Sequence, residues 1–145
     1  MSFYCDYKVE PNCMEFAGAV SSDVKKKLKA YNIKKSKIRE IAIACYEAEI
    51  NIVIHSCGGH VYARIEKDMV ELQFIDQGPG IEDLDVVLVE GYSTASEFAR
   101  ENGFGAGLGL PNIKAVADEF DLQSSPDGTT LIVRFYLNEN DIVTK

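Results

Sequence analysis

Two polar side chains lie one helical turn apart in an otherwise apolar segment. Residues 36–56, SKIREIAIACYEAEINIVIHS, have the spacing of a buried helix, and Glu47 and Asn51 share one face of it because they are four residues apart. A carboxylate and a carboxamide are costly to bury unless something satisfies them. They could serve as a general base and a metal ligand. Alternatively, they meet water at the edge of a sheet, as neighbouring Glu49 is expected to do.

A second candidate is the stretch FIDQGPGI, in which an apolar strand ends at Asp76 and is followed by Gly78 and Gly80. A carboxylate at a strand end can accept a hydrogen bond from an amino group of a ligand such as a purine. The two glycines would let a flat ring lie against the backbone. Asp-x-Gly is also common in ordinary turns, so the stretch alone leaves both interpretations open.

The third candidate is ENGFGAGLGLPNI, residues 101–113, with glycine at every second position from 103 to 109. Such a run is poorly suited to a helix or strand, because glycine loses the most backbone entropy on folding. Glycines before a helix allow backbone N–H groups to converge on phosphate. The run matches neither the P-loop nor the G-x-G-x-x-G pattern. A flexible turn is the alternative.

The surrounding pattern predicts the elements that would position these residues. They are an edge strand at 3–9, a helix capped near Ser21, Ser22 or Asp23, the buried helix at 36–56, strands at 60–67 and 69–76, a helix at 110–120, and a hairpin turning at 126–128. This order predicts an α+β fold, a two-layer α/β sandwich with helices on one face of a mostly antiparallel sheet. A length of 145 residues favours a single domain, 1–145.

The charge of the chain is uneven. Residues 25–39 carry 8 of the 15 basic side chains and no acidic one, so the rest of the chain holds 7 basic and 23 acidic side chains. An acidic body repels nucleic acid, and no nucleic-acid partner is expected. The basic segment is either a solvated helix face or a docking patch for an acidic protein.

The chain has neither a run of about 18 apolar residues nor a signal-peptide pattern, so no membrane association is expected and the cytoplasm is the expected location. The four cysteines, at positions 5, 13, 45 and 57, form no CxxC pair. They are expected to be reduced and structural rather than metal ligands.

In chain order the motifs read Glu-x-x-x-Asn, Asp-x-Gly-x-Gly, Gly-x-Gly-Leu-Gly-Leu and Gly-Thr. This series, over roughly residues 36–137, resembles the GHKL superfamily that joins gyrase, Hsp90, histidine kinases and MutL, with the Bergerat ATP-binding fold of histidine-kinase-like ATPases. The resemblance implies that ATP and Mg²⁺ are the cofactors. It makes Glu47 the general base and Asn51 the Mg²⁺ ligand.

The resemblance also implies roles for the glycine motifs. Asp76 would bind the adenine amino group, Gly78 and Gly80 would line the base, and Thr129 would support the adenine through water. A lid would wrap the triphosphate, formed by Gly105, Gly107, Leu108, Gly109 and Leu110.

The stretches DQGPGI, EGYSTA and GLGLPNIKAVADEF are similar to the bacterial anti-sigma-factor serine kinases and, more closely, to their switch-kinase relatives. This similarity implies an ATP- and Mg²⁺-dependent serine/threonine protein kinase that phosphorylates a small STAS-domain antagonist protein. A sigma factor is a further partner in true anti-sigma members, and relatives often form homodimers. Two alternatives are a non-catalytic, ATP-gated module that sequesters a regulatory partner, and a kinase subunit that acts with a separate histidine-containing protein.

Overall fold

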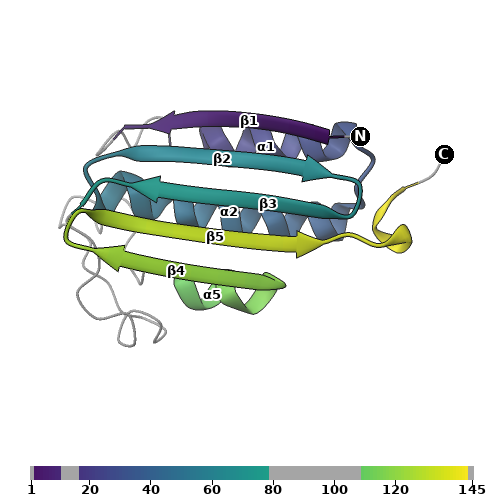
Figure 1. Ribbon diagram of the computed structural model, residues 1–145. Coiled ribbons are helices and arrows are strands. Elements are labelled where there is room, and N and C mark those ends of the chain that lie inside the picture. Colours follow the sequence, from purple (N-terminus) through teal and green to yellow (C-terminus); the bar gives the residue numbers. More distant parts are fainter. Residues whose placement is uncertain (1, 11–16, 79–108, 144–145) are drawn as a thin grey trace.

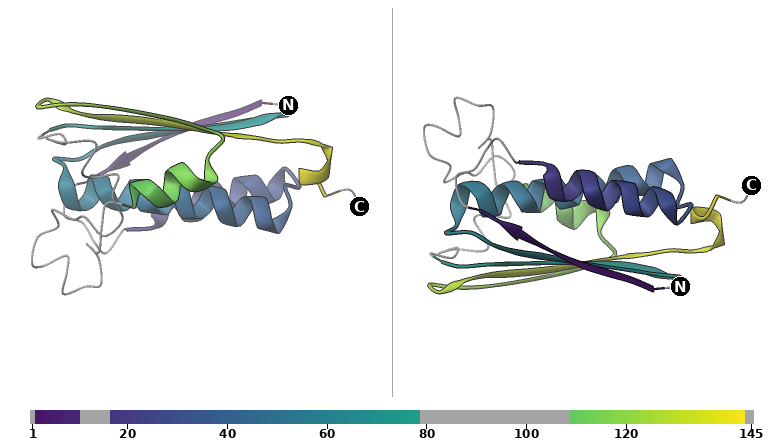
Figure 2. Two further views of the ribbon diagram at one scale, coloured as in Figure 1. Left: turned by 90° about the horizontal axis from the view of Figure 1, so that it is seen from below. Right: turned by 90° about the horizontal axis from the view of Figure 1, so that it is seen from above.

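The computed structural model describes residues 2–10, 17–78 and 109–143. Within these ranges five strands form one open antiparallel sheet, and three α-helices cover one of its faces. Figure 1 views the sheet from its uncovered side, and Figure 2 shows the two layers edge-on. The predicted two-layer α+β architecture is confirmed, with every strand pairing among the described residues antiparallel.

The sheet has the strand order β1-β2-β3-β5-β4. Its strands are β1 (Ser2–Val9), β2 (Gly59–Glu66), β3 (Met69–Asp76), β4 (Glu119–Ser125) and β5 (Gly128–Tyr136). The predicted edge strand near the N-terminus is confirmed as β1, the strands predicted at 60–67 and 69–76 form β2 and β3, and the predicted hairpin joins β4 to β5. Alternate residues of the central strand β3 point into the core, which explains its apolar spacing: Val70, Leu72 and Phe74 are all buried.

The helices are α1 (Ala19–Ala30), α2 (Lys35–His55) and α5 (Leu110–Val116), and a short 3₁₀ turn, η2, spans Glu139–Asp141. The helix predicted at 110–120 is shorter than expected, because Glu119 and Phe120 belong to β4 instead. These two residues pair with Arg134 and Val133 of β5. Strand pairing with a buried neighbour therefore outweighs the local helical pattern.

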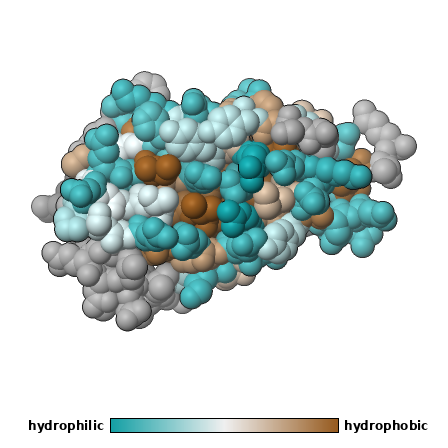
Figure 3. All heavy atoms as spheres, viewed as in Figure 1, coloured by the Kyte–Doolittle hydropathy of each residue, from teal (hydrophilic) through white to brown (hydrophobic). Residues whose placement is uncertain are grey.

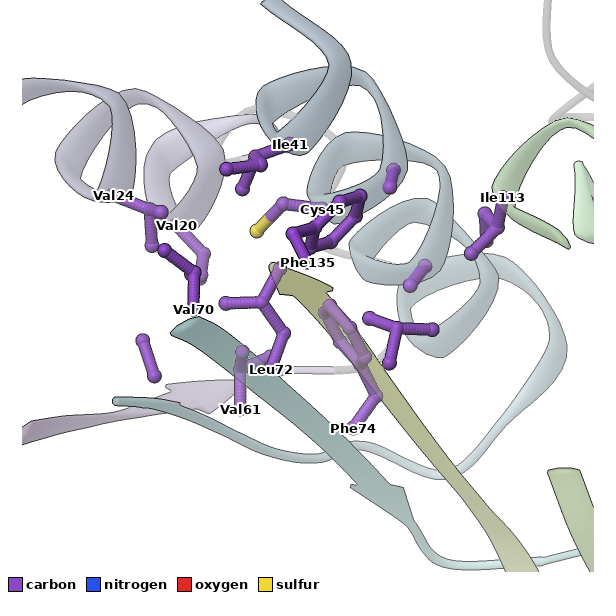
Figure 4. Close-up of a cluster of buried hydrophobic side chains, with 14 of the residues drawn as sticks. Val20, Val24, Ile41, Cys45, Val61, Val70, Leu72, Phe74, Ile113 and Phe135 are labelled. Atoms are coloured by element: carbon purple, nitrogen blue, oxygen red, sulfur yellow. The ribbon is translucent and has the colours of Figure 1, made fainter. Parts of the chain in front are cut away.

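The core fills the space between the sheet and the helices. Figure 4 shows side chains from both layers meeting there, with Cys45 of α2 close to Phe135 of β5 and Ile113 of α5 beside the same cluster. Cys45, Phe135 and Ile113 are fully buried. Burial raises the pKa of the Cys45 thiol well above its ordinary value, so this cysteine is held as a neutral packing group.

The start of α1 corrects two sequence expectations. The helix begins with Gly18 as its N-cap, and Ser21, Ser22 and Asp23 lie inside it. Its cap comes from Glu49, which is 2% exposed rather than solvated. The Glu49 carboxylate accepts hydrogen bonds from the backbone N–H groups of Gly18 at 3.0 Å, Val20 at 3.3 Å and Ser21 at 3.1 Å. A side chain of α2 thus supplies the acceptors that the first turn of α1 needs.

Replacing Glu49 by alanine is expected to destabilise the fold by about 2–3 kcal/mol, because two of the N–H groups it satisfies belong to buried residues. Glu49→Gln keeps an acceptor oxygen and should lose less. Urea unfolding at neutral pH measures both changes. Glu40→Ala, on the same helix, is the control, and a loss for Glu49→Ala no larger than for Glu40→Ala would contradict the capping role.

The uncovered face of the sheet is predominantly polar, with apolar surface in separate spots (Figure 3). An ion-pair network crosses four strands there. Arg134 contacts Glu71 at 2.6 Å and Glu119 at 3.1 Å, Arg64 contacts Glu71 at 3.4 Å, and Tyr136 donates its hydroxyl to Glu119. In the part of the chain that the structure describes, no helix is long and apolar enough to cross a membrane.

The basic segment lies on α1, the turn after it and the start of α2. Two of its lysines have structural partners: Lys27 lies over the Phe3 ring at 5.4 Å, and Lys34 pairs with the buried Asp141 at 3.0 Å. The others include five exposed side chains, those of Lys25, Lys26, Lys29, Lys35 and Arg39. The segment is therefore largely exposed, with structural contacts at two positions, and its use as a docking patch stays a prediction.

Candidate functional site

Asp76 lies at the last position of β3, at the end of the sheet where β5 begins (Figure 1). Its Oδ1 atom accepts a hydrogen bond of 2.9 Å from the backbone N–H of Thr129. The side chain is partly buried, and this burial raises the pKa of Asp76 to about 6, against the opposing effect of the Thr129 N–H. A carboxylate with such a pKa is largely ionised at neutral pH, although its surroundings do little to stabilise the charge.

Three neighbouring glycines let other backbone segments approach the end of β3. A Cβ atom on Gly59 would lie 2.8 Å from Asp76 Cα, and one on Gly128 would overlap the Asp76 carbonyl oxygen. Gly78 donates its N–H to the Asp127 carbonyl at 2.5 Å, and a Cβ there would overlap the Pro126 carbonyl oxygen. Larger residues at these positions would therefore push the three segments apart.

The side chain of Thr129 lies at the same end of the sheet, where β5 begins. Its hydroxyl lies 2.8 Å from the hydroxyl of Ser124, and either oxygen could be the donor. The two residues are directly paired between β4 and β5. Neither Ser124 nor Gly59 was predicted from the sequence as a site residue. The Pro-Asp-Gly turn could have indicated Ser124, because the hairpin register around that turn pairs Ser124 with Thr129.

Glu47 and Asn51 lie on α2, about two turns and one turn before its end at His55. The end of α2 is joined to the end of β3, because Cys57 donates its N–H to the Gln77 carbonyl at 3.0 Å. Glu47 and Asn51 therefore lie on a helix whose C-terminal end is linked by this hydrogen bond to the residue after Asp76. Burial raises the pKa of Glu47 above its ordinary value.

The end of the third motif meets α2 at Glu47. Gly109 is the N-cap of α5 and lies against the Glu47 side chain. Leu110 is 2% exposed and its side chain belongs to the core, so the structure gives it a packing role. Four other residues singled out from the sequence lie outside the described residues: Gly80, Gly105, Gly107 and Leu108.

The described residues fit an adenine nucleotide. One carboxylate oxygen of Asp76 accepts from the protein, and the described residues provide no donor for the other, which matches the need of an adenine amino group. No group of three or more His, Cys, Asp and Glu side chains that could hold a metal is found within the described ranges. A nucleotide-bound Mg²⁺ needs only one or two protein ligands, and the Asn51 side chain offers an oxygen of the type it prefers.

Comparisons with known proteins show which family the sequence matches. The profile of the family described as "Histidine kinase-like ATPase domain" matches residues 14–135. The chain is similar to an anti-sigma F factor of Bacillus velezensis, with 30% identity over 111 residues, which cover 72% of this chain and 73% of the relative. It is also similar to the serine/threonine-protein kinase RsbT of Bacillus subtilis, with 42% identity over 57 residues, 39% of this chain and 37% of the relative.

A solved structure shows the same fold. The crystal structure of the RsbU and RsbW domains of a Mycobacterium tuberculosis protein superposes with a TM-score of 0.63 at 18% identity. The match covers 99% of this chain and 35% of that chain. The present chain thus spans about a third of that longer protein, and the similarity concerns the fold.

Proposed function

Because the chain belongs to the family of histidine kinase-like ATPase domains, we propose that its 145 residues form one ATP-binding domain that phosphorylates a serine or threonine of a partner protein in the cytoplasm. The similarity to anti-sigma F factors and to the kinase RsbT supports this activity. The observation that carries the proposal is the partly buried Glu47 carboxyl group, held against Gly109 of the second glycine motif.

In this proposal the sheet end binds the base. The Asp76 carboxylate accepts from the adenine amino group while Thr129 N–H holds its other oxygen, and the Thr129 hydroxyl supports the base through water. Asn51 provides a ligand for the metal ion. Bound Mg-ATP supplies the phosphoryl group, and the metal charge stabilises the negative charge that develops on it.

Glu47 acts as the general base. It accepts the proton of the attacking hydroxyl group, and burial raises its pKa toward the range in which a carboxylate is an effective proton acceptor near neutral pH.

The partner that fits this activity is a small antagonist protein of the STAS class, with a sigma factor as a second binding partner. This assignment rests on the sequence resemblance and on the names of the relatives, anti-sigma F factor and RsbT. A homodimer is the oligomeric state that the same resemblance implies.

Partner capture with phosphosite mapping tests the proposal. The protein is immobilised and exposed to lysate of its host with and without Mg-ATP, and the bound proteins are examined by mass spectrometry. The expected result is a small protein that gains phosphoserine or phosphothreonine and is then released. Glu47→Gln is the matched bait, and it should capture the same protein without phosphorylating it.

Two other outcomes would replace the proposal. A partner that is retained in Mg-ATP and gains no phosphate from the unaltered bait would indicate an ATP-gated binding module. An acid-labile phosphohistidine on the partner would indicate a kinase subunit that acts with a separate histidine-containing protein.

A further inference from the structure

Gly109 has a backbone conformation and a neighbour that together require glycine. Its φ of 71° and ψ of 0° are left-handed, the region that glycine enters most readily. A Cβ atom built on it would lie 2.9 Å from Glu47 Cδ and 3.0 Å from Glu47 Cβ, and it would overlap Oε2. The Glu47 side chain therefore occupies the space that any other residue at position 109 would fill.

The spacing between α2 and the start of α5, where the Glu47 side chain lies, is fixed by packing. Leu110 and Ile113, the first and fourth residues of α5, are 2% and 0% exposed and pack into the core next to α2. The N-cap of α5 is thus anchored one residue before a buried leucine. Because neither helix can retreat without opening the core, the carboxyl group is confined between α2 and the Gly109 backbone.

We propose that Gly109 is a positioning residue, which holds the Glu47 carboxyl group in one orientation by direct contact of its backbone. The catalytic part of this inference rests on the proposed function. Glutamate has three rotatable side-chain bonds, and a confined carboxyl group offers its oxygens to a hydroxyl in far fewer orientations. This role differs from phosphate binding, which the sequence motif implied for Gly109.

The first test needs no activity. Thermal unfolding is compared for wild type, Gly109→Ala, Glu47→Ala and the double variant, with Gly18→Ala as the control. Gly18 is also left-handed, at φ 94°, but a Cβ there would meet only the Tyr46 ring, at 3.3 Å. Gly109→Ala should lower Tm by roughly 5 °C more than Gly18→Ala. Most of this excess should vanish when Glu47 is alanine, because alanine lacks Cδ and Oε2 and keeps only the Cβ contact at 3.0 Å.

If Gly109→Ala lowers Tm equally in the wild-type and Glu47→Ala backgrounds, the proposed contact between Gly109 and Glu47 is refuted. If Gly109→Ala alone fails to fold, Glu47→Ala should suppress the defect. The Glu47→Ala Gly109→Ala double variant should then show a cooperative unfolding transition. A double variant that also fails to fold, while Glu47→Ala alone folds, would count against the proposal.

The second test separates positioning from phosphate binding. Gly109→Ala should lower kcat for phosphoryl transfer by about 10-fold or more while KM for ATP stays within about 3-fold, and the acidic limb of the pH–kcat profile should shift. In the Glu47→Ala background it should cause no further loss of kcat. A loss of ATP affinity that accounts for the whole effect would overturn the proposal. A wild-type protein that transfers no phosphate would refute the proposed function, and the Tm comparison would still decide the contact.

Discussion

Replacing Glu47 by glutamine should lower the rate of phosphoryl transfer by about 10²–10⁴-fold and leave ATP binding nearly unchanged. Glutamine has the shape of glutamate and fits the space beside Gly109, but it cannot accept the hydroxyl proton. The rate is measured at saturating Mg-ATP with the captured partner as substrate, and ATP affinity is measured by calorimetry. Glu40→Gln, on the same helix, should behave as wild type.

The pH dependence gives a second readout of the same residue. Because burial raises the pKa of Glu47 above its ordinary value, the ionised fraction of the base falls as the pH drops through that raised pKa. The wild-type kcat should fall in parallel, and the residual rate of Glu47→Gln should lack this limb. Equal losses of transfer and ATP binding in Glu47→Gln would refute the base assignment.

Replacing Asp76 by asparagine should weaken ATP binding by about 10–150-fold without lowering the stability of the free protein. The asparagine carbonyl can still accept the Thr129 N–H, but its NH₂ group then faces the adenine amino group, where two donors oppose each other. Calorimetric titration with Mg-ATP measures the affinity. Asp121→Asn on the edge strand β4 is the matched control and should bind normally.

The effect of Asp76→Asn on stability follows from the pKa of Asp76. This pKa is about 6 in the folded protein, against an ordinary value of 3.8. Between these values the unfolded chain releases the proton that the folded protein keeps. Wild-type stability from this group therefore falls as pH rises from about 4 to 6 and stays reduced above 6. Asparagine cannot ionise, so Asp76→Asn should not lose this stability. Relative to wild type, its urea unfolding midpoint should therefore rise as the pH increases from about 4 to 6.

Nucleotide affinity should have the opposite pH trend. Protonation of Asp76 below pH about 6 removes the acceptor that the adenine amino group needs, so wild-type affinity for ATP should weaken as pH falls. An affinity that is constant from pH 5 to 8, or an Asp76→Asn variant that binds ATP normally, would exclude Asp76 as the adenine contact.

The sequence predicts elements well where one periodicity dominates. The helix α2 and the strands β2, β3 and β5 follow from their apolar spacing, because burial of that spacing is what holds them in place. The start of α1 could not be predicted in the same way. Its cap is the Glu49 side chain, 31 residues from Gly18, and no local pattern reveals a partner at that distance.

The two glutamates of α2 show the same limit at the site. Glu47 and Glu49 are two positions apart, so they point to different sides of the helix, and the sequence does not say which neighbour each side meets. The structure places Glu47 against α5 and Glu49 against α1. Motif order singled out Asp76 and Thr129 as candidates, whereas their hydrogen bond depends on strand register across 53 residues.

Both ends of the described chain lie away from the end of the sheet that carries Asp76. Ser2 pairs with Glu66 at the finish of β2, while Asp76 pairs with Gly59 at its beginning, seven residues away. Val143 is bonded at 2.6 Å to Asn32, in the turn before α2, and both ends appear on the same side of Figure 1. At about 3.3 Å per residue, a surface linker or fused reporter attached at Ser2 would lie roughly 23 Å from Asp76. Tethered molecules would consequently present the Asp76 end of the sheet outward to solution.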